Sequence, residues 1–194
     1  VIAVRDPSRK AALAKIAGDQ KHIEECPLFL VWLADTSRAK RIEAAESVPL
    51  VTLPYFETFL VAAIDAALAA QNAVVAAESL GLSTVYIGAL RNDPVKVAAH
   101  LELPPGVLAV FGLCVGSAGA TAANEIKPRL SQAAVAFDET YRIPPDEAEL
   151  RRAYDDKLAQ FSKRNEMSDD TWTRRVQRRM GKIAAMGGRD KLVE

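Results

Sequence analysis

The stretch from Pro54 to Leu80 constrains the fold more than any other part of this chain, because it is rich in alanine and apolar on almost every face. Its length predicts one helix of about 40 Å, at ~1.5 Å per residue. Polar residues interrupt it, which argues against a membrane span; they are Asp65, Gln71, Asn72 and Glu78. A helix that is apolar all round must be buried, so we expect it between a sheet and a second body. That body is either a dimer partner or the rest of a monomer.

Four short apolar runs predict the strands of that sheet. They are rich in β-branched residues and are bounded by turn-forming residues; they are Val1–Val4, Leu28–Ala34, Thr84–Ile87 and Val107–Val115. The second and fourth runs are apolar at successive positions, which indicates burial on both faces of the sheet. Residues 133–137 are interpreted as a further short strand. Because the chain starts inside a predicted strand, we expect that an upstream segment precedes it.

Capping residues predict where the other helices begin. Asp6-Pro7 opens a helix that stops at Gly18, and Asn92 or Asp93 caps a short helix over 94–101. Further helices are predicted over 144–161 and 168–186, followed by a loose tail. We therefore expect a core over residues 1–143 and a helical extension over residues 144–194.

The bulk composition excludes several classes of protein. The 194 residues are 49% hydrophobic and 26% charged, as in an ordinary soluble protein with a sizeable core. The formal net charge is zero, so no global field favours nucleic acid or a membrane surface. Two cysteines are too few for a disulfide framework or a metal site. No targeting segment is visible, and we expect a cytoplasmic location.

Small and cationic residues follow the predicted strands. Gly88 and Ala89 come after the third strand, where small residues allow a flat cofactor ring to approach the backbone; the same pair also suits a plain turn. Lys127 and Arg129 flank Pro128 in extended backbone, so both side chains point roughly the same way. They can balance anionic charge on a phosphate or a reduced ring, or they can simply lie at the surface.

Two further polar side chains are candidates for binding a cofactor. Gln20 offers donors and an acceptor for ring carbonyls, and Arg91 can serve a phosphate or pair with an acid. The sequence contains no Ser-His-Asp set, paired-carboxylate motif, metal-ligand cluster or P-loop motif. This pattern is typical of an enzyme whose cofactor performs the chemistry while the protein orients it.

Four blocks carry a resemblance to a known family: Gly18-Asp19-Gln20-Lys21-His22, Tyr86-Ile87-Gly88-Ala89-Leu90-Arg91-Asn92, Phe111-Gly112-Leu113-Cys114-Val115-Gly116 and Lys127-Pro128-Arg129-Leu130. In order and spacing they resemble the oxygen-insensitive NADPH nitroreductase and flavin reductase family. The resemblance runs from Val1 to about Trp172 and is close across residues 70–130. It implies an α+β fold with a mostly antiparallel central sheet flanked by helices, closing as an intertwined homodimer.

The resemblance also implies a cofactor and a reaction. It assigns FMN contacts to Gln20, Tyr86, Ile87, Gly88, Ala89, Lys127, Pro128 and Arg129, with Arg91 as a further candidate, and it matches Arg164 to an arginine that helps to hold NADPH. It implies ping-pong, two-electron hydride transfer from NADPH or NADH through FMN to a nitroaromatic, a quinone or free flavin, without a fixed catalytic side chain. The rival hypothesis is a truncated or degenerate dimeric scaffold that does not retain FMN.

Overall fold

The computed structural model describes residues 1–119, 125–167 and 171–190. The chain divides into two compact units. The first comprises Val1–Gly119 together with Gly187–Glu194, and the second comprises Ala120–Met186.

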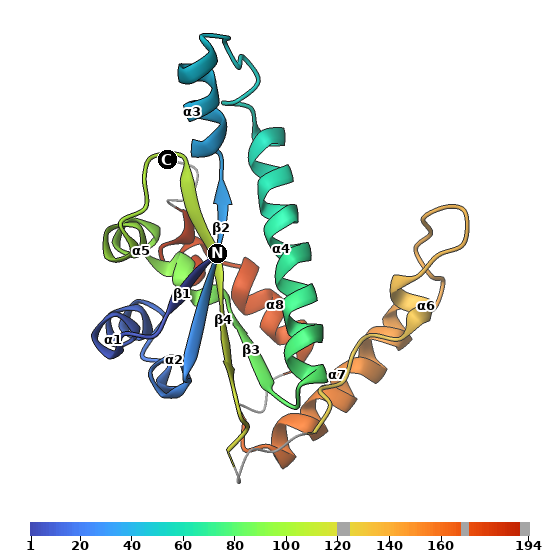
Figure 1. Cartoon of the computed structure of the whole chain (residues 1–194). Helices are drawn as coiled ribbons and strands as arrows, with labels where there is room; N and C mark the ends of the chain where they lie inside the picture. Colours follow the sequence, from blue (N-terminus) through green and yellow to red (C-terminus); the bar gives the residue numbers. More distant parts are fainter. Residues whose placement is uncertain (120–124, 168–170, 191–194) are drawn as a thin grey trace. The chain divides into compact units, whose positions relative to one another are not determined.

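The first unit is built around a four-stranded antiparallel sheet with the strand order β1-β2-β4-β3 (Figure 1). The strands are β1 (Ile2–Val4), β2 (Leu28–Asp35), β3 (Ser83–Ile87) and β4 (Val107–Gly116). The central pair, β2 and β4, places Phe29 opposite Cys114 and Trp32 opposite Phe111. The four predicted strands and the α+β class are therefore confirmed.

Helices α1 (Pro7–Ile16), α2 (Lys21–Glu25) and α5 (Pro94–Leu101) lie on one side of this sheet (Figure 1). The Asp6 cap is confirmed, since its carboxylate accepts from the Arg9 amide at 2.7 Å. Of the two candidates for the second cap, the structure selects Asp93, whose carboxylate accepts from the Lys96 amide at 3.0 Å. The cluster beneath these helices includes Phe29 and Val31 of β2, both fully buried. Alternate residues of β2 thus enter this cluster, as the pleat of a strand requires.

Helix α4 (Phe56–Ser79), which follows α3 (Ser37–Glu46), lies on the opposite side of the sheet (Figure 1). A stripe at helical spacing packs on Trp32 and Leu113 and consists of Ala66, Ala70, Val74 and Ala77. The other face of α4 leaves large apolar side chains exposed; they include Val61, Ile64, Leu68 and Val75. Within one chain, the helix is therefore buried on one side, not all round.

The apolar length of α4 also raises the question of a membrane span. By length and composition α4 could cross a membrane, and 17% of its apolar stretch is buried inside the chain. Core helices of soluble proteins meet the same criterion of length and composition. The exposed apolar face therefore indicates an interaction surface, but it does not show whether a protein or a membrane would bury that surface.

The second unit is helical and contains α6 (Gln132–Val135), α7 (Glu147–Arg164), α8 (Trp172–Met180) and the 3₁₀ helix η2 (Ile183–Met186). The Thr173 hydroxyl donates to the Asp155 carboxylate at 2.6 Å, and the Thr173 amide donates to the same carboxylate at 2.9 Å. The rings of Tyr154 and Trp172 meet edge-on at 5.8 Å. These contacts hold the start of α8 against α7.

Three predictions about local structure were wrong. Residues 133–137 contain part of helix α6 instead of a strand, because consecutive alanines favour a helix. The last α-helix ends at Met180, where Gly181 follows; η2 then continues the chain. Residues 187–190, the described part of the tail, are held and not loose, because the Arg189 side chain donates to the Asn92 side chain at 3.1 Å. Residues 168–170, the predicted cap of the last helix, and 191–194 lie outside the described residues.

The close approach of Phe29 to Gly112 allows the packing between β2 and β4 to be tested. A Cβ at position 112 would lie 2.3 Å from Phe29 Cζ, and Phe29 is fully buried. We expect Gly112→Ala to lower the free energy of unfolding by about 1–3 kcal/mol through overpacking. Urea unfolding measures it.

The matched control for this test is Gly119→Ala, where a Cβ would meet nothing within 4 Å. Adding Phe29→Leu to Gly112→Ala should recover part of the loss, because the smaller side chain frees space. Equal stability of the two alanine variants would contradict this account of the packing.

Candidate functional site

The turn after β3 is the first part of the candidate site. Ile87 ends the strand with its side chain 1% exposed in the core, so only the backbone of Ile87 can face a ligand. Gly88–Asn92 then forms the 3₁₀ helix η1. A Cβ on Gly88 would lie 3.3 Å from the Arg91 guanidinium, so the absence of a side chain leaves room for that group. Because β3 is an edge strand, this backbone lies at the margin of the sheet.

Ala89 fits this turn without backbone strain. The described non-glycine residues with positive φ are Asp19, Ser47, Glu102, Glu139 and Glu166, and Ala89 is not among them. Its methyl group packs against the hydrophobic cluster beneath α1 and α5. Alanine therefore serves this position as a small core residue and leaves the η1 backbone accessible.

Tyr86, the residue before Ile87, projects from the opposite face of β3. Its ring meets Phe111 edge-on at 5.3 Å, and its hydroxyl lies 3.4 Å from Gln71 of α4. Burial raises the pKa of the Tyr86 phenol, so the group stays protonated at neutral pH. Tyr86 is nevertheless 43% exposed, so part of the residue remains accessible to solvent.

Arg91 lines a hollow of about 740 Å³ next to the start of α4. Its guanidinium donates to the Val110 carbonyl of β4, which ties the charged group to the sheet. The aromatic residues on the wall of this hollow are Tyr55, Phe56 and Phe59. A cation beside exposed aromatic rings suits a planar, anionic ligand.

Gln20 and η1 meet at the C-terminal end of α1. The Gln20 side-chain amide donates to the Ala17 carbonyl at 2.8 Å, and the Asn92 side-chain amide donates to the Ile16 carbonyl at 3.3 Å. Two consecutive carbonyls, those of the last residue of α1 and of its C-cap Ala17, therefore hold the two segments. The structure thus brings Gln20 and the Gly88–Asn92 turn to one end of one helix, although they lie far apart in sequence.

The C-terminal tail joins the same cluster. The Arg189 guanidinium donates to the Asn92 side-chain carbonyl at 3.1 Å, so both ends of that amide are used. Gly188 has φ +89°, and a Cβ there would lie 2.5 Å from the Asn92 backbone oxygen. Asn92 and Arg189 are positioning residues that sequence reasoning missed, and the Gly187-Gly188 pair is the sequence signal that could have indicated a close approach.

The other predicted site residues belong to the second unit. Lys127 and Arg129 are exposed, and Pro128 between them is half-buried. The Tyr154 hydroxyl of α7 lies 3.4 Å from the Pro128 carbonyl, which it can bond as a donor. The two cations are therefore carried on a segment that α7 supports.

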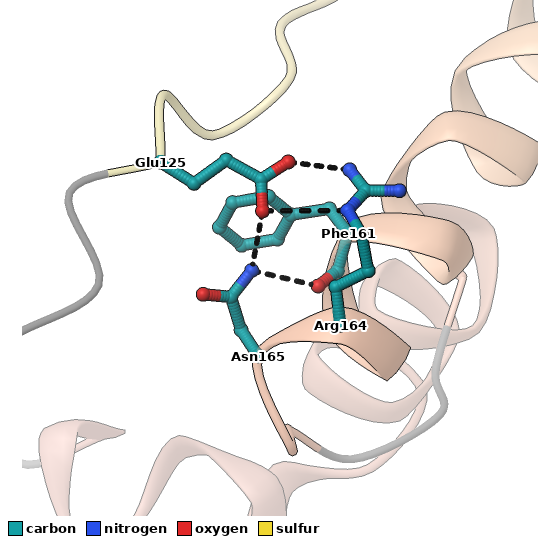
Figure 2. A network of polar contacts seen from close by, with 4 residues as sticks. All are labelled: Glu125, Phe161, Arg164 and Asn165. Carbon is teal, nitrogen blue, oxygen red and sulfur yellow. Dashed lines mark hydrogen bonds and ion pairs between the residues drawn. The ribbon is translucent and has the colours of Figure 1, made fainter.

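Arg164, at the last turn of α7, is already paired. Its guanidinium donates to both carboxylate oxygens of Glu125, and Asn165 donates to the same carboxylate at 2.8 Å (Figure 2). The Asn165 amide also bonds the Phe161 carbonyl at 2.9 Å, which fixes its orientation (Figure 2). The bond from Arg164, and then that from Asn165, lowers the pKa of Glu125, while Glu125 raises the pKa of Arg164.

Family models match most of this chain. The nitroreductase family matches residues 3–117, and the C-terminal domain of that family matches residues 127–194. An FMN reductase (NADPH) of Bacillus subtilis is 36% identical over 181 residues, covering 91% of this chain and 72% of the relative. An oxygen-insensitive NADPH nitroreductase of Salmonella typhimurium is 37% identical over 180 residues, covering 92% of this chain and 71% of the relative.

A solved structure agrees with these matches. The structure of the NfrA1 nitroreductase from B. subtilis superposes with a TM-score of 0.87 at 34% identity, covering 99% of this chain and 78% of the other. The fold and the sequence blocks therefore agree with the same family.

The clamp on η1 can be tested without a ligand. We expect Asn92→Ala to remove both side-chain bonds and to lower the free energy of unfolding by about 1–3 kcal/mol. Hydrogen exchange across residues 88–92 should become faster, and Arg189→Ala should produce a smaller change in the same segment. Lys182→Ala, an exposed position near the tail, is the control. Unchanged exchange across residues 88–92 in both clamp variants would show that the clamp does not order the turn.

Proposed function

Because this chain belongs to the nitroreductase family, we propose that it is an FMN-dependent NAD(P)H oxidoreductase that reduces nitroaromatics, quinones or free flavin. The observation that supports this most directly is the η1 turn. It offers an accessible small-residue backbone at the edge of a sheet, and the Asn92 side chain holds it to a backbone carbonyl of α1 and to the Arg189 side chain of the tail.

The residues of the first unit fit the ring of FMN. The backbone of Gly88 and Ala89 allows a flat ring to lie close, and the amides there can donate to a ring nitrogen. Gln20 stands at the same end of α1, with its side-chain carbonyl oxygen available to accept a bond. The Tyr86 ring, just before the turn, supplies an aromatic surface, and the Arg91 guanidinium, within it, supplies a positive charge.

The residues of the second unit fit the negative charge of FMN. Lys127 and Arg129 are exposed cations on one extended segment, and either can pair with a phosphate or stabilise charge on the ring. The chemistry that FMN would supply when held by these residues is two-electron transfer from NAD(P)H to the second substrate. The side chains need only bind, orient and neutralise charge, so the proposal assigns no general acid or base.

The open face of α4 supports a homodimer. The exposed side chains lie on the side of the helix away from the sheet, and small alanines between them allow a second helix to approach closely. A homodimer would bury this stripe against its own copy about a two-fold axis. We propose that α4 forms the centre of that interface.

Two measurements test the proposed function: whether the purified protein retains FMN, and whether it turns over NAD(P)H with an acceptor. A yellow preparation with flavin absorption that oxidises NADPH or NADH only when a nitroaromatic, a quinone or free flavin is present would support the oxidoreductase. A colourless protein that ignores added FMN would support the rival, a scaffold that does not retain the cofactor.

The cationic segment provides a quantitative test. Lys127→Ala and Arg129→Ala should each weaken FMN binding by about 1–3 kcal/mol, because each removes a charge-assisted hydrogen bond. Quenching of FMN fluorescence measures the dissociation constant. Arg152→Ala is the control, since Arg152 is an exposed cation of α7 paired with Glu149. Unchanged affinity in both test variants would remove the segment from the cofactor site.

The proposed dimer interface can be tested by placing a charged side chain on the exposed face of α4. Leu68 is 62% exposed on α4, and Leu68→Glu should convert the dimer to a monomer, because an unpaired carboxylate cannot be buried between apolar helices. Sedimentation velocity measures the change. Val95→Glu, on α5 at 76% exposure, is the control and should remain dimeric. A wild-type chain that sediments as a monomer at micromolar concentration would refute the proposed interface.

A further inference from the structure

Arg164 and Glu125 form an ion pair in which both carboxylate oxygens are engaged. The guanidinium reaches one oxygen through Nη2 and the other through Nε, the latter at 3.4 Å (Figure 2). The Asn165 amide donates to the second oxygen at 2.8 Å. Three donors therefore converge on one carboxylate at the C-terminal end of α7.

This pair lies within reach of solvent. The side chains of Arg164 and Glu125 are 54% and 39% exposed, so a dissolved anion can approach the same guanidinium. The lowered pKa of Glu125 keeps the carboxylate ionised at neutral pH. A phosphate and a carboxylate both bind the planar fork of an arginine, and the two anions repel each other. An anion that binds Arg164 must therefore displace Glu125 or pay the cost of lying beside it.

The NAD(P)H proposed above carries such an anion in one of its two forms. NADPH has a phosphate on the 2′ oxygen of its adenosine ribose, whereas NADH has a hydroxyl there. Resting on the proposed function, we propose that Glu125 sets the dinucleotide preference of this protein by competing with the 2′-phosphate of NADPH for Arg164. Glu125 weakens the binding of NADPH and leaves that of NADH unaffected or improved, since the carboxylate can accept a bond from the 2′-hydroxyl.

Adenosine 2′,5′-bisphosphate and AMP are the probes for this proposal, because they differ in the 2′-phosphate. Glu125→Gln keeps the size of the side chain and its capacity to accept from Asn165, but it removes the charge. Calorimetric titration at low ionic strength should show tighter binding of the bisphosphate by roughly fivefold, as expected for loss of an exposed ion-pair competitor, with AMP unchanged.

Two further variants complete this experiment. Glu149→Gln is the matched control, because Glu149 forms an exposed ion pair with Arg152 on the same helix at 2.6 Å. It should leave both affinities unchanged. Arg164→Ala should weaken the bisphosphate in the wild-type background and remove the gain produced by Glu125→Gln.

Three results would overturn the proposal. The first is unchanged or weaker bisphosphate binding in Glu125→Gln while Arg164→Ala still weakens it. The second is an equal change for bisphosphate and AMP, which would indicate that Glu125 only positions the segment before Lys127. The third is no effect of Arg164→Ala, which would remove Arg164 from phosphate binding altogether.

The proposed oxidoreductase activity is tested by measurements that do not depend on these titrations. Retention of FMN and oxidation of NADH with an acceptor report on the oxidoreductase, and neither requires Arg164. If FMN is retained and NADH is oxidised while Glu125→Gln changes nothing, the competition fails and the function stands. If FMN is not retained, the function fails, and the probe affinities still decide the competition.

Discussion

The pairing of β2 with β4 is the interaction on which the first unit depends. These central strands place alternate side chains on opposite faces, so the same backbone ladder supports two separate hydrophobic clusters. Phe29 enters one cluster and Trp32 the other. Gly112 is part of the same constraint, because its missing side chain leaves the space that the Phe29 ring fills. A shift of one residue in this register would exchange the faces and expose both cores.

The η1 turn, which is the proposed site for the flavin ring, is held in place by contacts with this sheet and with α1. Ile87 anchors the turn through a buried side chain, and the amide of Asn92 connects it to α1 and to Arg189. In the proposed site, the surface offered to the ring at this turn is backbone, and Ile87, Asn92 and Arg189 hold that backbone in place. This division suits an oxidoreductase of the nitroreductase family, in which the cofactor performs the hydride chemistry.

In the second unit, charged side chains are already engaged within the chain. Arg164 has Glu125 as its partner, and Asp155 accepts two hydrogen bonds from Thr173 at the start of α8. An exposed ion pair such as Arg164–Glu125 contributes little to folding. In the proposed competition, the larger effect of the Arg164–Glu125 pair is on recognition, because an anionic ligand would compete with a carboxylate that is already bound. Among the ion pairs of the described residues, neither Lys127 nor Arg129 is paired with a carboxylate. These two cations are therefore more readily available than Arg164 to bind an anionic ligand.

Local pattern was enough to predict the four strands, the cap at Asp6, a second cap at either Asn92 or Asp93, the long α4 helix and the segments that resemble the nitroreductase family, because these depend on neighbours a few residues apart. The roles of the predicted site residues stay predictions. Three features required the tertiary structure: the open face of α4, the clamp between Asn92 and Arg189, and the pairing of Arg164 with Glu125. The clamp joins residues 97 positions apart and the ion pair joins residues 39 apart. No local periodicity encodes such contacts, because they arise only when separate elements pack together.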